Sequence, residues 1–238
     1  MSSSLARSGS SLRWKIAFLI CAAIAVSYFD RQTLPVAISA IQREIPITNT
    51  QFSWLQSAFL LAYAFMYAGG GKLTDILGTR RGYFVIMLWW SLACASHGLA
   101  TGFFGLAVSR FLLGMGEGGG FPAATKAVAE WFPVRQRSTA MGIINAGTSL
   151  GAVVAPPMIA MILALGSWRW VFFISGSIGV LWTVWWMKDY FPARLHPRLS
   201  DTEREEIREV LADSGRPKAK IPWIRLFSFP QVWGLVVA

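Results

Sequence analysis

Six stretches of the chain are almost continuously apolar, and each is long enough to cross a bilayer, whose ~30 Å hydrocarbon core needs about 20 apolar residues in helical form. They do not alternate apolar and polar residues as the strands of a membrane barrel do. The connections between them are short, so we expect antiparallel neighbouring helices. The predicted spans cover residues 14–40, 52–77, 83–100, 104–130, 138–164 and 168–190.

The first stretch also fits a second interpretation, because Arg13 and Lys15 precede an apolar run that contains the triplet Ala23-Ile24-Ala25. A basic segment, an apolar run and small residues at its end are typical of a secretory signal peptide. The apolar pattern continues past residue 30, however, and five further spans follow. We therefore expect this stretch to remain as the first membrane helix.

The pattern turns polar after the sixth span. Ser200 and Glu203 have the spacing of a capping box. Ile207, Val210 and Leu211 then form a narrow apolar stripe on a charged helix. We expect one short amphipathic surface helix in a cytoplasmic connector.

The predicted organisation has four parts: a cytoplasmic tail, a six-helix membrane domain, the connector, and the start of a seventh span that is cut short. The last part is too short to cross a membrane, so the chain is expected to be incomplete. The parts cover residues 1–13, 14–190, 191–229 and 230–238.

Composition agrees with an integral membrane protein. Of the 238 residues, 54% are hydrophobic and 14% charged, against roughly 25% charged in an average soluble domain, and the mean hydropathy is +0.47. A net charge of +10 would indicate nucleic-acid binding in a soluble chain. Here the basic residues lie mainly in short connections, and no basic stripe carries interleaved aromatic residues. We expect the lipid bilayer, and no nucleic acid, as a partner.

The cysteines and histidines indicate neither a disulfide framework nor a metal site. Cys21 and Cys94 lie inside apolar runs, where they are interpreted as small buried hydrophobic residues. His97 and His196 fall on different sides of the predicted membrane. We expect no bound metal and no cofactor.

The basic residues set the orientation of the helices, since cytoplasmic connections carry an excess of Lys and Arg. With a cytoplasmic N-terminus, the outer connections hold only Arg43 and Arg169. The inner side then holds Arg7, Arg13, Lys15, Lys72, Arg80, Arg81, Arg135, Arg137, Lys188 and Arg194. We expect a multi-pass protein of the cell inner membrane with its N-terminus in the cytoplasm.

Four charged residues lie deep inside the spans, where each costs at least ~2.5 kcal/mol at the bilayer centre. Asp30 and Arg31 are on the first helix, and Arg110 and Glu117 lie on nearly the same face of the fourth. Counting 1.5 Å per residue puts Asp30 about 24 Å above the inner boundary and Arg110 about 9 Å below the outer one. In a core about 30 Å thick these depths nearly coincide, so the two side chains are expected to pair.

Two interpretations of these charges stay open. A purely structural ion pair between helices one and four accounts for Asp30 and Arg110 but leaves Arg31 and Glu117 without partners, and unpaired buried charges are costly. The other interpretation is a proton and substrate path. A carboxylic acid in an apolar environment keeps a proton more readily than in water, which makes Glu117 the candidate proton carrier. Arg31 is then free to meet an anion.

The turn after the second span has the spacing G-x-L-x-D-x-x-G-x-R. Its glycines permit a tight turn, and its acid can cap the next helix or pair with a base of this or a neighbouring loop. The fixed positions are Gly71, Leu73, Asp75, Gly78 and Arg80.

This spacing resembles the signature between helices two and three of the major facilitator superfamily. Other segments are similar to its anion:cation symporter branch, above all to bacterial hexuronate carriers and secondly to galactonate carriers. These segments are residues 28–34, 110–118, 130–133 and 145–157. The loop departs from the signature at Ile76 and Thr79, where basic residues are usual, and we expect a weaker charge network there.

The resemblance implies an all-α membrane fold in which the six spans form two inverted three-helix repeats. They would be the N-terminal half of a 12-helix carrier that rocks around a central site. A missing C-terminal six-helix half would be the partner that completes that site.

The resemblance also implies roles for single residues. Asp30 and Glu117 would be the protonatable acids, Arg110 the partner of Asp30, and Arg31 the ligand of the substrate carboxylate. The residues that would line the sugar-facing cavity are Tyr63, Asn145 and Thr148. Tyr63 also fits a packing or interfacial aromatic, and Asn145 an interhelical hydrogen bond.

Three other features favour simpler interpretations. Closely spaced glycines in the fourth span permit close helix approach. Lys126 either pairs with Glu130 or neutralises a substrate on exit. Tryptophans near the span ends are interpreted as interfacial anchors: Trp54, Trp89, Trp90, Trp131, Trp168 and Trp170.

The expected function is proton-coupled import of a small organic anion, in particular a hexuronate such as galacturonate or glucuronate. Two alternatives stay open. One is a non-transporting membrane fragment, or an interaction partner for a separate C-terminal half. The other is a multidrug antiporter, which fits the loop but not the arginine-rich anion site. The sequence contains no nucleophile–base pair and no metal-ligand set, so we expect no enzymatic activity.

Overall fold

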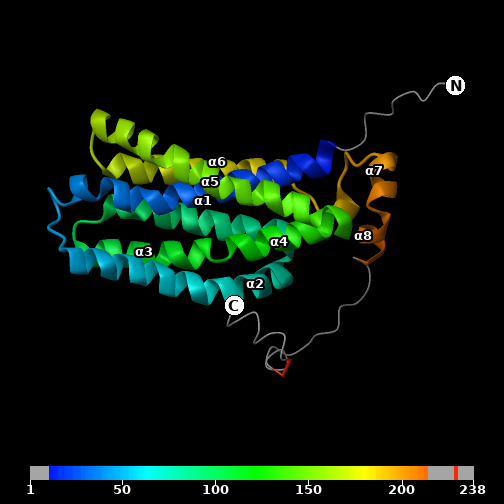
Figure 1. Ribbon diagram of the computed structural model, residues 1–238, viewed down its shortest axis with the longest axis horizontal. Helices are drawn as coiled ribbons and strands as arrows, with labels where there is room; N and C mark the ends of the chain where they lie inside the picture. Colours follow the sequence, from blue (N-terminus) through cyan, green and yellow to red (C-terminus); the bar gives the residue numbers. More distant parts are fainter. Residues whose placement is uncertain (1–10, 214–227, 230–238) are drawn as a thin grey trace.

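The computed structural model describes residues 11–213 and 228–229. The described chain forms a long bundle of helices that lie side by side, with two short helices at one end (Figure 1). The elements are α1 (Ser11–Ile41), α2 (Asn49–Ser96), the 3-10 helix η1 (His97–Leu99), α3 (Phe103–Glu117), α4 (Gly120–Trp131), α5 (Val134–Leu165), α6 (Arg169–Asp189), the 3-10 helix η2 (Ala193–Leu195), α7 (Asp201–Glu206) and α8 (Arg208–Asp213). The expected start of a seventh span lies outside the described residues.

The helix α2 makes two of the predicted passes. It has 48 residues, and a straight helix of that length would be about 72 Å long, more than twice a ~30 Å core. At Gly78 the backbone takes φ 75° and ψ 156°, a conformation that favours glycine, and the helix folds back there. We call residues 49–77 the first leg and residues 79–96 the second leg of α2. The predicted loop is wrong in extent, since helix continues to either side of this one glycine.

The fourth predicted span is divided into α3 and α4, which have 15 and 12 residues. Between them the N–H of Gly119 donates to the carbonyl of Gly116 at 3.2 Å, a tighter turn than the α-helix has. α1, α2 with η1, α5 and α6 are each long and apolar enough to cross a membrane. With two passes in α2 and one in α3 and α4 together, the described chain has the six expected passes.

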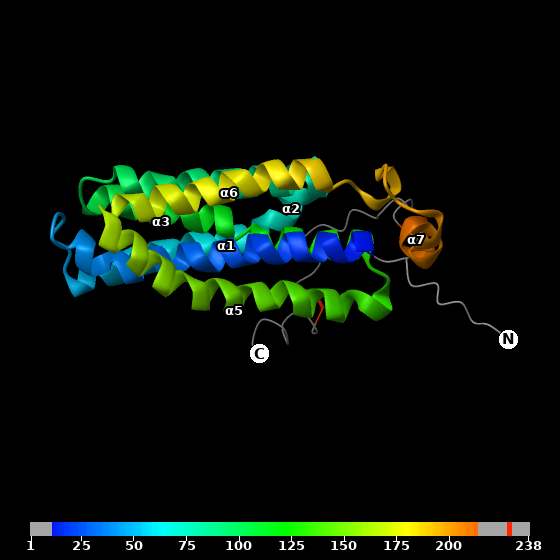
Figure 2. The same cartoon turned by 90° about the horizontal axis from the view of Figure 1, so that it is seen from above.

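The helices pack in pairs that follow a twofold pattern. α1 packs on α5, α3 packs on the first leg of α2, and the second leg of α2 packs on α6. Figure 2 shows α1 running between α5 and α6. Counted as six spans, the pairs are 1–5, 4–2 and 3–6. Exchanging spans 1, 2 and 3 with spans 4, 5 and 6 reproduces this set, as two inverted three-helix repeats require. The predicted all-α half-bundle is confirmed.

Glycines allow the closest of these contacts, as the sequence predicts for the fourth span. A Cβ at Gly118 on α3–α4 would lie 2.5 Å from the carbonyl oxygen of Tyr63 on the first leg of α2. On α5, a Cβ at Gly147 would overlap the carbonyl of Cys21 on α1. Backbones this close pack well only without a side chain between them.

Gly147→Ala is expected to destabilise the protein by about 1–3 kcal/mol, because overpacking forces α1 and α5 apart. The matched control is Gly142→Ala on the same helix, where a Cβ would meet nothing within 4 Å. Thermal unfolding in detergent, followed by size-exclusion chromatography, measures both. Equal melting temperatures for the two variants would contradict the packing described here.

Half of the tryptophans that the sequence places at the interface are buried instead. Trp54, Trp89 and Trp170 are exposed, whereas Trp90, Trp131 and Trp168 are at most 2% exposed. Adjacent residues of a helix point about 100° apart, so one of Trp89 and Trp90 faces outward and the other the core. The position of a tryptophan near a span end therefore did not decide which way its ring points.

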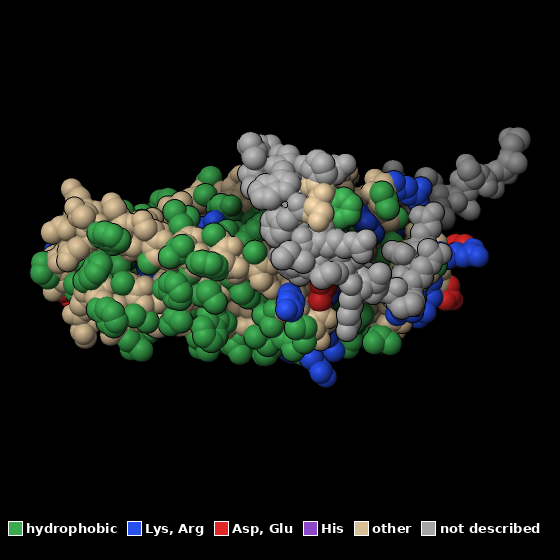
Figure 3. All heavy atoms as spheres, turned by 90° about the horizontal axis from the view of Figure 1, so that it is seen from below, with side chains coloured by type: hydrophobic (Ala, Val, Ile, Leu, Met, Phe, Trp, Pro, Cys, Tyr) green, Lys and Arg blue, Asp and Glu red, His purple; other side chains and the backbone are tan. Residues whose placement is uncertain are grey.

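The surface matches a membrane environment along the middle of the bundle. In Figure 3 apolar side chains cover much of the visible face, and most of the visible charged side chains lie toward the end that carries α7 and α8. Large apolar residues that are more than half exposed include Phe18, Leu60, Phe65, Leu92 and Leu181. Helices that present such residues to the outside are stable in lipid.

The connector helices dock on the start of α1. Ser200 caps α7 by accepting a hydrogen bond from the N–H of Glu203 at 3.2 Å, as predicted. The Glu203 carboxylate also accepts from the N–H of Leu12 at 3.1 Å, and the first N–H groups of a helix need such partners. Arg13 pairs with Glu206 next to this contact. The one predicted connector helix is thus two short ones, α7 and α8.

The apolar stripe of the connector is buried, with Ile207 1% and Val210 6% exposed. His196, which precedes these helices in the connector, lies edge-on to Trp131 and Phe191 at centroid distances of 5.4 and 5.5 Å. Burial lowers the pKa of His196 below its ordinary value, so the ring is neutral at neutral pH. The connector is therefore packed on the bundle through an apolar contact.

Candidate functional site

A buried ion pair joins the first and fourth spans near the middle of the bundle. The Nε of Arg31 on α1 lies 2.8 Å from Oε2 of Glu117 at the end of α3. Ser27, one turn before Arg31, donates its hydroxyl to the same oxygen at 2.7 Å. The Glu117 side chain is fully buried, whereas 24% of the Arg31 side chain is exposed. The pair is therefore accessible from the Arg31 side and closed on the Glu117 side.

Aromatic rings surround the Arg31 guanidinium. Its carbon lies 4.6 Å from the ring centroid of Tyr28, 5.5 Å from that of Phe59 and 4.6 Å from that of Tyr63. Such contacts stabilise a cation by about 0.5–2 kcal/mol, more when it is desolvated. The structure thus brings the predicted Tyr63 to Arg31, and Phe59 belongs to the same wall although no motif points to it.

Asp30 faces a different side of α1 from Arg31. Its Oδ1 accepts a hydrogen bond from the Ser175 hydroxyl of α6 and lies 3.5 Å from the Cys94 sulfur of the second leg of α2. Because neighbouring helix residues point about 100° apart, Asp30 is directed toward spans 3 and 6 while Arg31 is directed toward spans 2 and 4. The adjacent residues Asp30 and Arg31 therefore belong to two separate clusters of polar side chains.

The expected ion pair between Asp30 and Arg110 is not formed within the described residues. Two buried nitrogens of Arg110, Nε and Nη2, and the Oδ2 of Asp30 make no hydrogen bond. The Arg110 guanidinium lies 5.6 Å from the Phe59 ring centroid. Asp30 and Arg110 still attract each other electrostatically. The pairing of Arg31 with Glu117 also corrects the expectation that Arg31 is free to meet an anion, since its guanidinium already has a protein partner.

The depth count failed for a physical reason. α1 has 31 residues and is about 46 Å long, which exceeds a ~30 Å core. The residue at which α1 enters the core is therefore not fixed by the helix itself, and counting from Trp14 does not set the height of Asp30 or Arg31 relative to Glu117.

The two predicted residues of α5 do not contact this cluster. The Asn145 side chain donates to the carbonyl of Met141 at 2.9 Å, and the Thr148 hydroxyl donates to the carbonyl of Asn145 at 2.7 Å. Asn145 is exposed and Thr148 partly so. Both lie on a part of α5 that the described chain leaves open.

The loop motif forms a polar cluster at the connector end of the bundle. Asp75 pairs with Lys126 of α4 at 2.6 Å. Arg80 donates to the carbonyl of Met187 on α6 at 2.5 Å, and its guanidinium stacks on Phe191. The expected pairing of Lys126 with Glu130 is wrong, because the turn at Gly78 brings Asp75 to Lys126 instead.

One departure from the loop signature contributes to this cluster. Thr79 donates its hydroxyl to Glu130 at 2.6 Å, and Tyr190 donates to the other oxygen of the same carboxylate at 2.7 Å. At position 79, a hydrogen bond to Glu130 therefore replaces the ion pair that a basic residue would form. The other departure from the signature, Ile76, does not change the packing of this cluster, since its side chain is 71% exposed.

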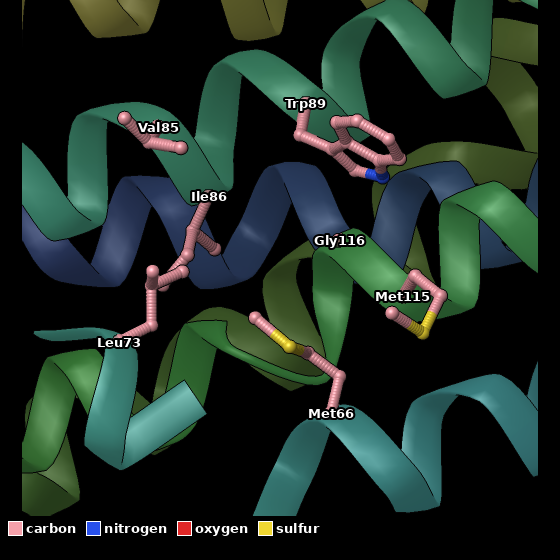
Figure 4. Close-up of a pocket in the computed structure, with 7 residues that line it drawn as sticks. All are labelled: Met66, Leu73, Val85, Ile86, Trp89, Met115 and Gly116. Atoms are coloured by element: carbon pink, nitrogen blue, oxygen red, sulfur yellow. The ribbon is translucent and has the colours of Figure 1, made fainter. Parts of the chain in front are cut away.

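An apolar cavity of about 200 Å³ lies between the legs of α2 and α3, near the loop motif. Figure 4 shows the side chains of Met66, Leu73, Val85, Ile86, Trp89 and Met115 around it. The indole N–H of Trp89 is bound to the carbonyl of Leu112. A charged ligand would find no partner among these side chains, so the Arg31–Glu117 cluster is the better candidate for an anion site.

Besides Phe59, three hydrogen-bonding residues of the candidate site were missed from the sequence. Ser27, Cys94 and Ser175 all hydrogen-bond to the buried acids. Single Ser and Cys residues in apolar helices are common packing residues, so only spacing held a signal: Ser27 and Arg31 are four residues apart and share a face.

Comparison with known proteins agrees with this arrangement. The family model described as "Major Facilitator Superfamily" matches residues 12–238. The galacturonate transporter of Dickeya chrysanthemi is 33% identical over 229 residues, which is 95% of this chain and 66% of that protein. The hexuronate transporter of Escherichia coli (strain K12) is 35% identical over 196 residues, or 82% of this chain and 45% of that protein.

A solved structure with the same fold is a bacterial homologue of the human lysosomal transporter Spinster in an inward-facing, unoccupied conformation. It aligns with a TM-score of 0.69 at 21% identity and covers 90% of this chain and 47% of that chain. This chain thus spans about two thirds of the galacturonate transporter and less than half of the other two proteins. The family match, the two relatives and the six-pass fold show that this chain is a multi-pass membrane protein that belongs to the major facilitator superfamily, a family of transporters.

Proposed function

We propose that this chain supplies the N-terminal half of a proton-coupled carrier that imports a sugar acid such as galacturonate or glucuronate. The observation that carries the proposal is the Arg31–Glu117 pair, in which a partly exposed cation lies 2.8 Å from a fully buried acid. The names of the galacturonate and hexuronate transporters support the substrate class.

Coupling follows from an exchange of carboxylates at Arg31. While Glu117 is ionised, its carboxylate neutralises the guanidinium. Once Glu117 takes up a proton, its charge is gone, and the carboxylate of an arriving sugar acid replaces it. A proton and a monovalent anion then enter together. The net charge of Arg31, Glu117 and the bound substrate is therefore the same as that of Arg31 and Glu117 without substrate. This exchange avoids an unpaired buried charge, which costs about 3–5 kcal/mol.

Asp30 and Arg110 form a second couple on the other side of α1. Protonation of Asp30 removes the attraction between them, and the loaded carrier then turns inward. Asp30 is fully buried, so its charge strongly affects the energy of the helices around it. The proposed role of this couple is to make the conformational change depend on protons.

The sugar hydroxyls would meet the polar residues around Arg31. Tyr63 lies beside the guanidinium. Asn145 and Thr148 lie on the open part of α5, and we propose that they contact substrate when a C-terminal half closes over this surface. The arrangement follows the general plan of carriers whose site lies between two halves.

The connector end of the bundle is proposed to face the cytoplasm of a bacterial cell, with the protein in the inner membrane. This end carries the loop motif, the start of α1 and the connector helices, and positive charge is enriched on the cytoplasmic side. The division into four parts at 1–13, 14–190, 191–229 and 230–238 stays a proposal.

Uptake of labelled galacturonate by proteoliposomes that contain the full-length carrier tests the substrate class. We expect saturable uptake that unlabelled glucuronate inhibits and that uncharged galactose does not, because only the acids offer a carboxylate to Arg31. Uptake of galactose at the same rate, or no uptake of any sugar acid by folded protein, would contradict the proposal.

A further inference from the structure

We propose that His97 is a positioning residue for proton coupling: it offers Arg110 a second hydrogen-bond acceptor, which the guanidinium takes when Asp30 is protonated. The inference rests on the proposed function and extends it to the outer side of the site. His97 lies in η1, directly after the second leg of α2, and is fully buried.

The backbone places His97 beside Arg110. The hydroxyl of Ser96 donates to that of Ser109 at 2.9 Å, so the residues that precede His97 and Arg110 are bonded to each other. The His97 ring stacks on Phe172 of α6, with centroids 4.9 Å apart and planes 7° apart. These contacts hold the imidazole between α3 and α6.

The surroundings of the ring fix its tautomer. Nδ1 lies 2.9 Å from the carbonyl oxygen of Ala93 and 3.1 Å from that of Cys94. Carbonyl oxygens only accept, so Nδ1 carries the hydrogen. Nε2 is then an acceptor, and it is buried without a hydrogen-bond partner. A neutral imidazole with an open acceptor is a suitable ligand for a guanidinium.

Donors and acceptors around Arg110 are complementary but unpaired. Nε and Nη2 of Arg110 are buried donors without partners. Oδ2 of Asp30 and Nε2 of His97 are buried acceptors without partners. Leaving such groups unpaired costs about 1–3 kcal/mol each, so the guanidinium gains by binding one or the other acceptor.

The charge on Asp30 decides between the two acceptors. An ionised Asp30 attracts Arg110 more strongly than a neutral imidazole does. When a proton binds to the Asp30 carboxylate, that attraction is lost, and the guanidinium takes the lone pair of His97 Nε2. His97 stays neutral throughout, because placing a second positive charge in this buried site beside Arg110 would be costly. The other titratable and charged groups that act on Asp30 and Arg110 are Glu117, Arg31 and Cys94.

His97 therefore stabilises the state in which Asp30 carries a proton. Without the second acceptor, Arg110 stays directed at Asp30 and favours the ionised form. Protonation then needs a more acidic medium. The loss of a hydrogen bond to a charged group is expected to shift the pH of half-maximal uptake downward by about one unit.

Two variants separate this role from a structural one, in the full-length carrier in proteoliposomes. His97→Asn keeps a donor near the Nδ1 position for the carbonyls of Ala93 and Cys94 but has nothing at the Nε2 position. His97→Gln places an amide oxygen where Nε2 was. We expect His97→Asn to move the pH profile of galacturonate uptake down by about one unit, and His97→Gln to restore it.

A purely structural role predicts less folded protein in both variants with no change in the pH profile. An unshifted profile for folded His97→Asn, or an equal shift in both variants, would overturn the proposal. If the wild-type carrier moves no sugar acid, the proposed function has failed and a second measurement decides the inference.

That measurement is the nitrogen NMR signal of His97 in the full-length protein, assigned by its loss in His97→Gln. Asp30→Asn imitates the protonated acid, so Arg110 should bind Nε2 in this variant. We expect the Nε2 signal to move in the direction of a hydrogen-bonded acceptor relative to wild type at a pH at which Asp30 is ionised. An unchanged Nε2 signal in Asp30→Asn contradicts the inference, whatever the transport assays give.

Discussion

Glu117→Gln is expected to lower the rate of proton-driven uptake of a sugar acid at least about 100-fold, while the exchange of internal for external substrate survives. Glutamine cannot be ionised, so Arg31 binds the substrate anion without a proton. After the anion leaves on the inside, Arg31 has no carboxylate to pair with, and an unpaired buried charge costs about 3–5 kcal/mol. The empty carrier therefore does not return, whereas the loaded carrier still moves in both directions.

Net uptake and counterflow in the same proteoliposomes measure the two predicted effects. Glu44→Gln is the matched control, because Glu44 is an exposed acid that pairs with Arg169 at the surface. It should leave both activities unchanged. Proton-driven uptake by Glu117→Gln at the rate of the control would show that Glu117 is not the coupling acid.

Arg31→Ala is expected to abolish both net uptake and exchange, again by at least about 100-fold, because it removes the only proposed partner of the substrate carboxylate and leaves Glu117 buried without a cation. Arg31→Lys should restore part of the activity. It keeps the charge but not the fork geometry that binds a carboxylate with two parallel hydrogen bonds.

The loss of the Arg31–Glu117 pair in Arg31→Ala is also expected to lower the melting temperature of the protein. Adding Glu117→Gln to Arg31→Ala removes the unpaired acid and should raise the melting temperature above that of the single variant. Arg43→Ala, on the exposed connection between α1 and α2, serves as the control for transport. Exchange activity in folded Arg31→Ala would contradict the assignment of Arg31 as the anion ligand.

The fold could be predicted because each span is an apolar run of nearly full bilayer length. The spacing of Gly71, Asp75 and Gly78 located the reversal between spans two and three. The length of helix to either side of Gly78 could not be predicted, because a single residue with positive φ suffices for the turn. The burial of Trp90, Trp131 and Trp168 depends on helix rotation, which apolar runs do not encode when every face is apolar.

The members of the site could be named from the sequence, but not their partners. A charge deep in an apolar helix stands out, so Asp30, Arg31, Arg110 and Glu117 were identified. Which acid meets which base depends on helix tilt and on where each helix enters the membrane. A one-residue change along a helix turns a side chain by about 100°. Ser27, Ser175 and His97 carry no such signal, because uncharged polar residues are tolerated in membrane helices.

The most direct test of the whole account is to follow protons and substrate together in the uptake experiment. Proteoliposomes with the full-length carrier and a pH-sensitive dye inside should acidify when galacturonate is added outside, in proportion to its uptake. Dissipating the proton gradient should stop accumulation, and Glu117→Gln should abolish the acidification. Galacturonate uptake without acidification, and with the same accumulation after the gradient is dissipated, would contradict proton coupling through the Arg31–Glu117 pair.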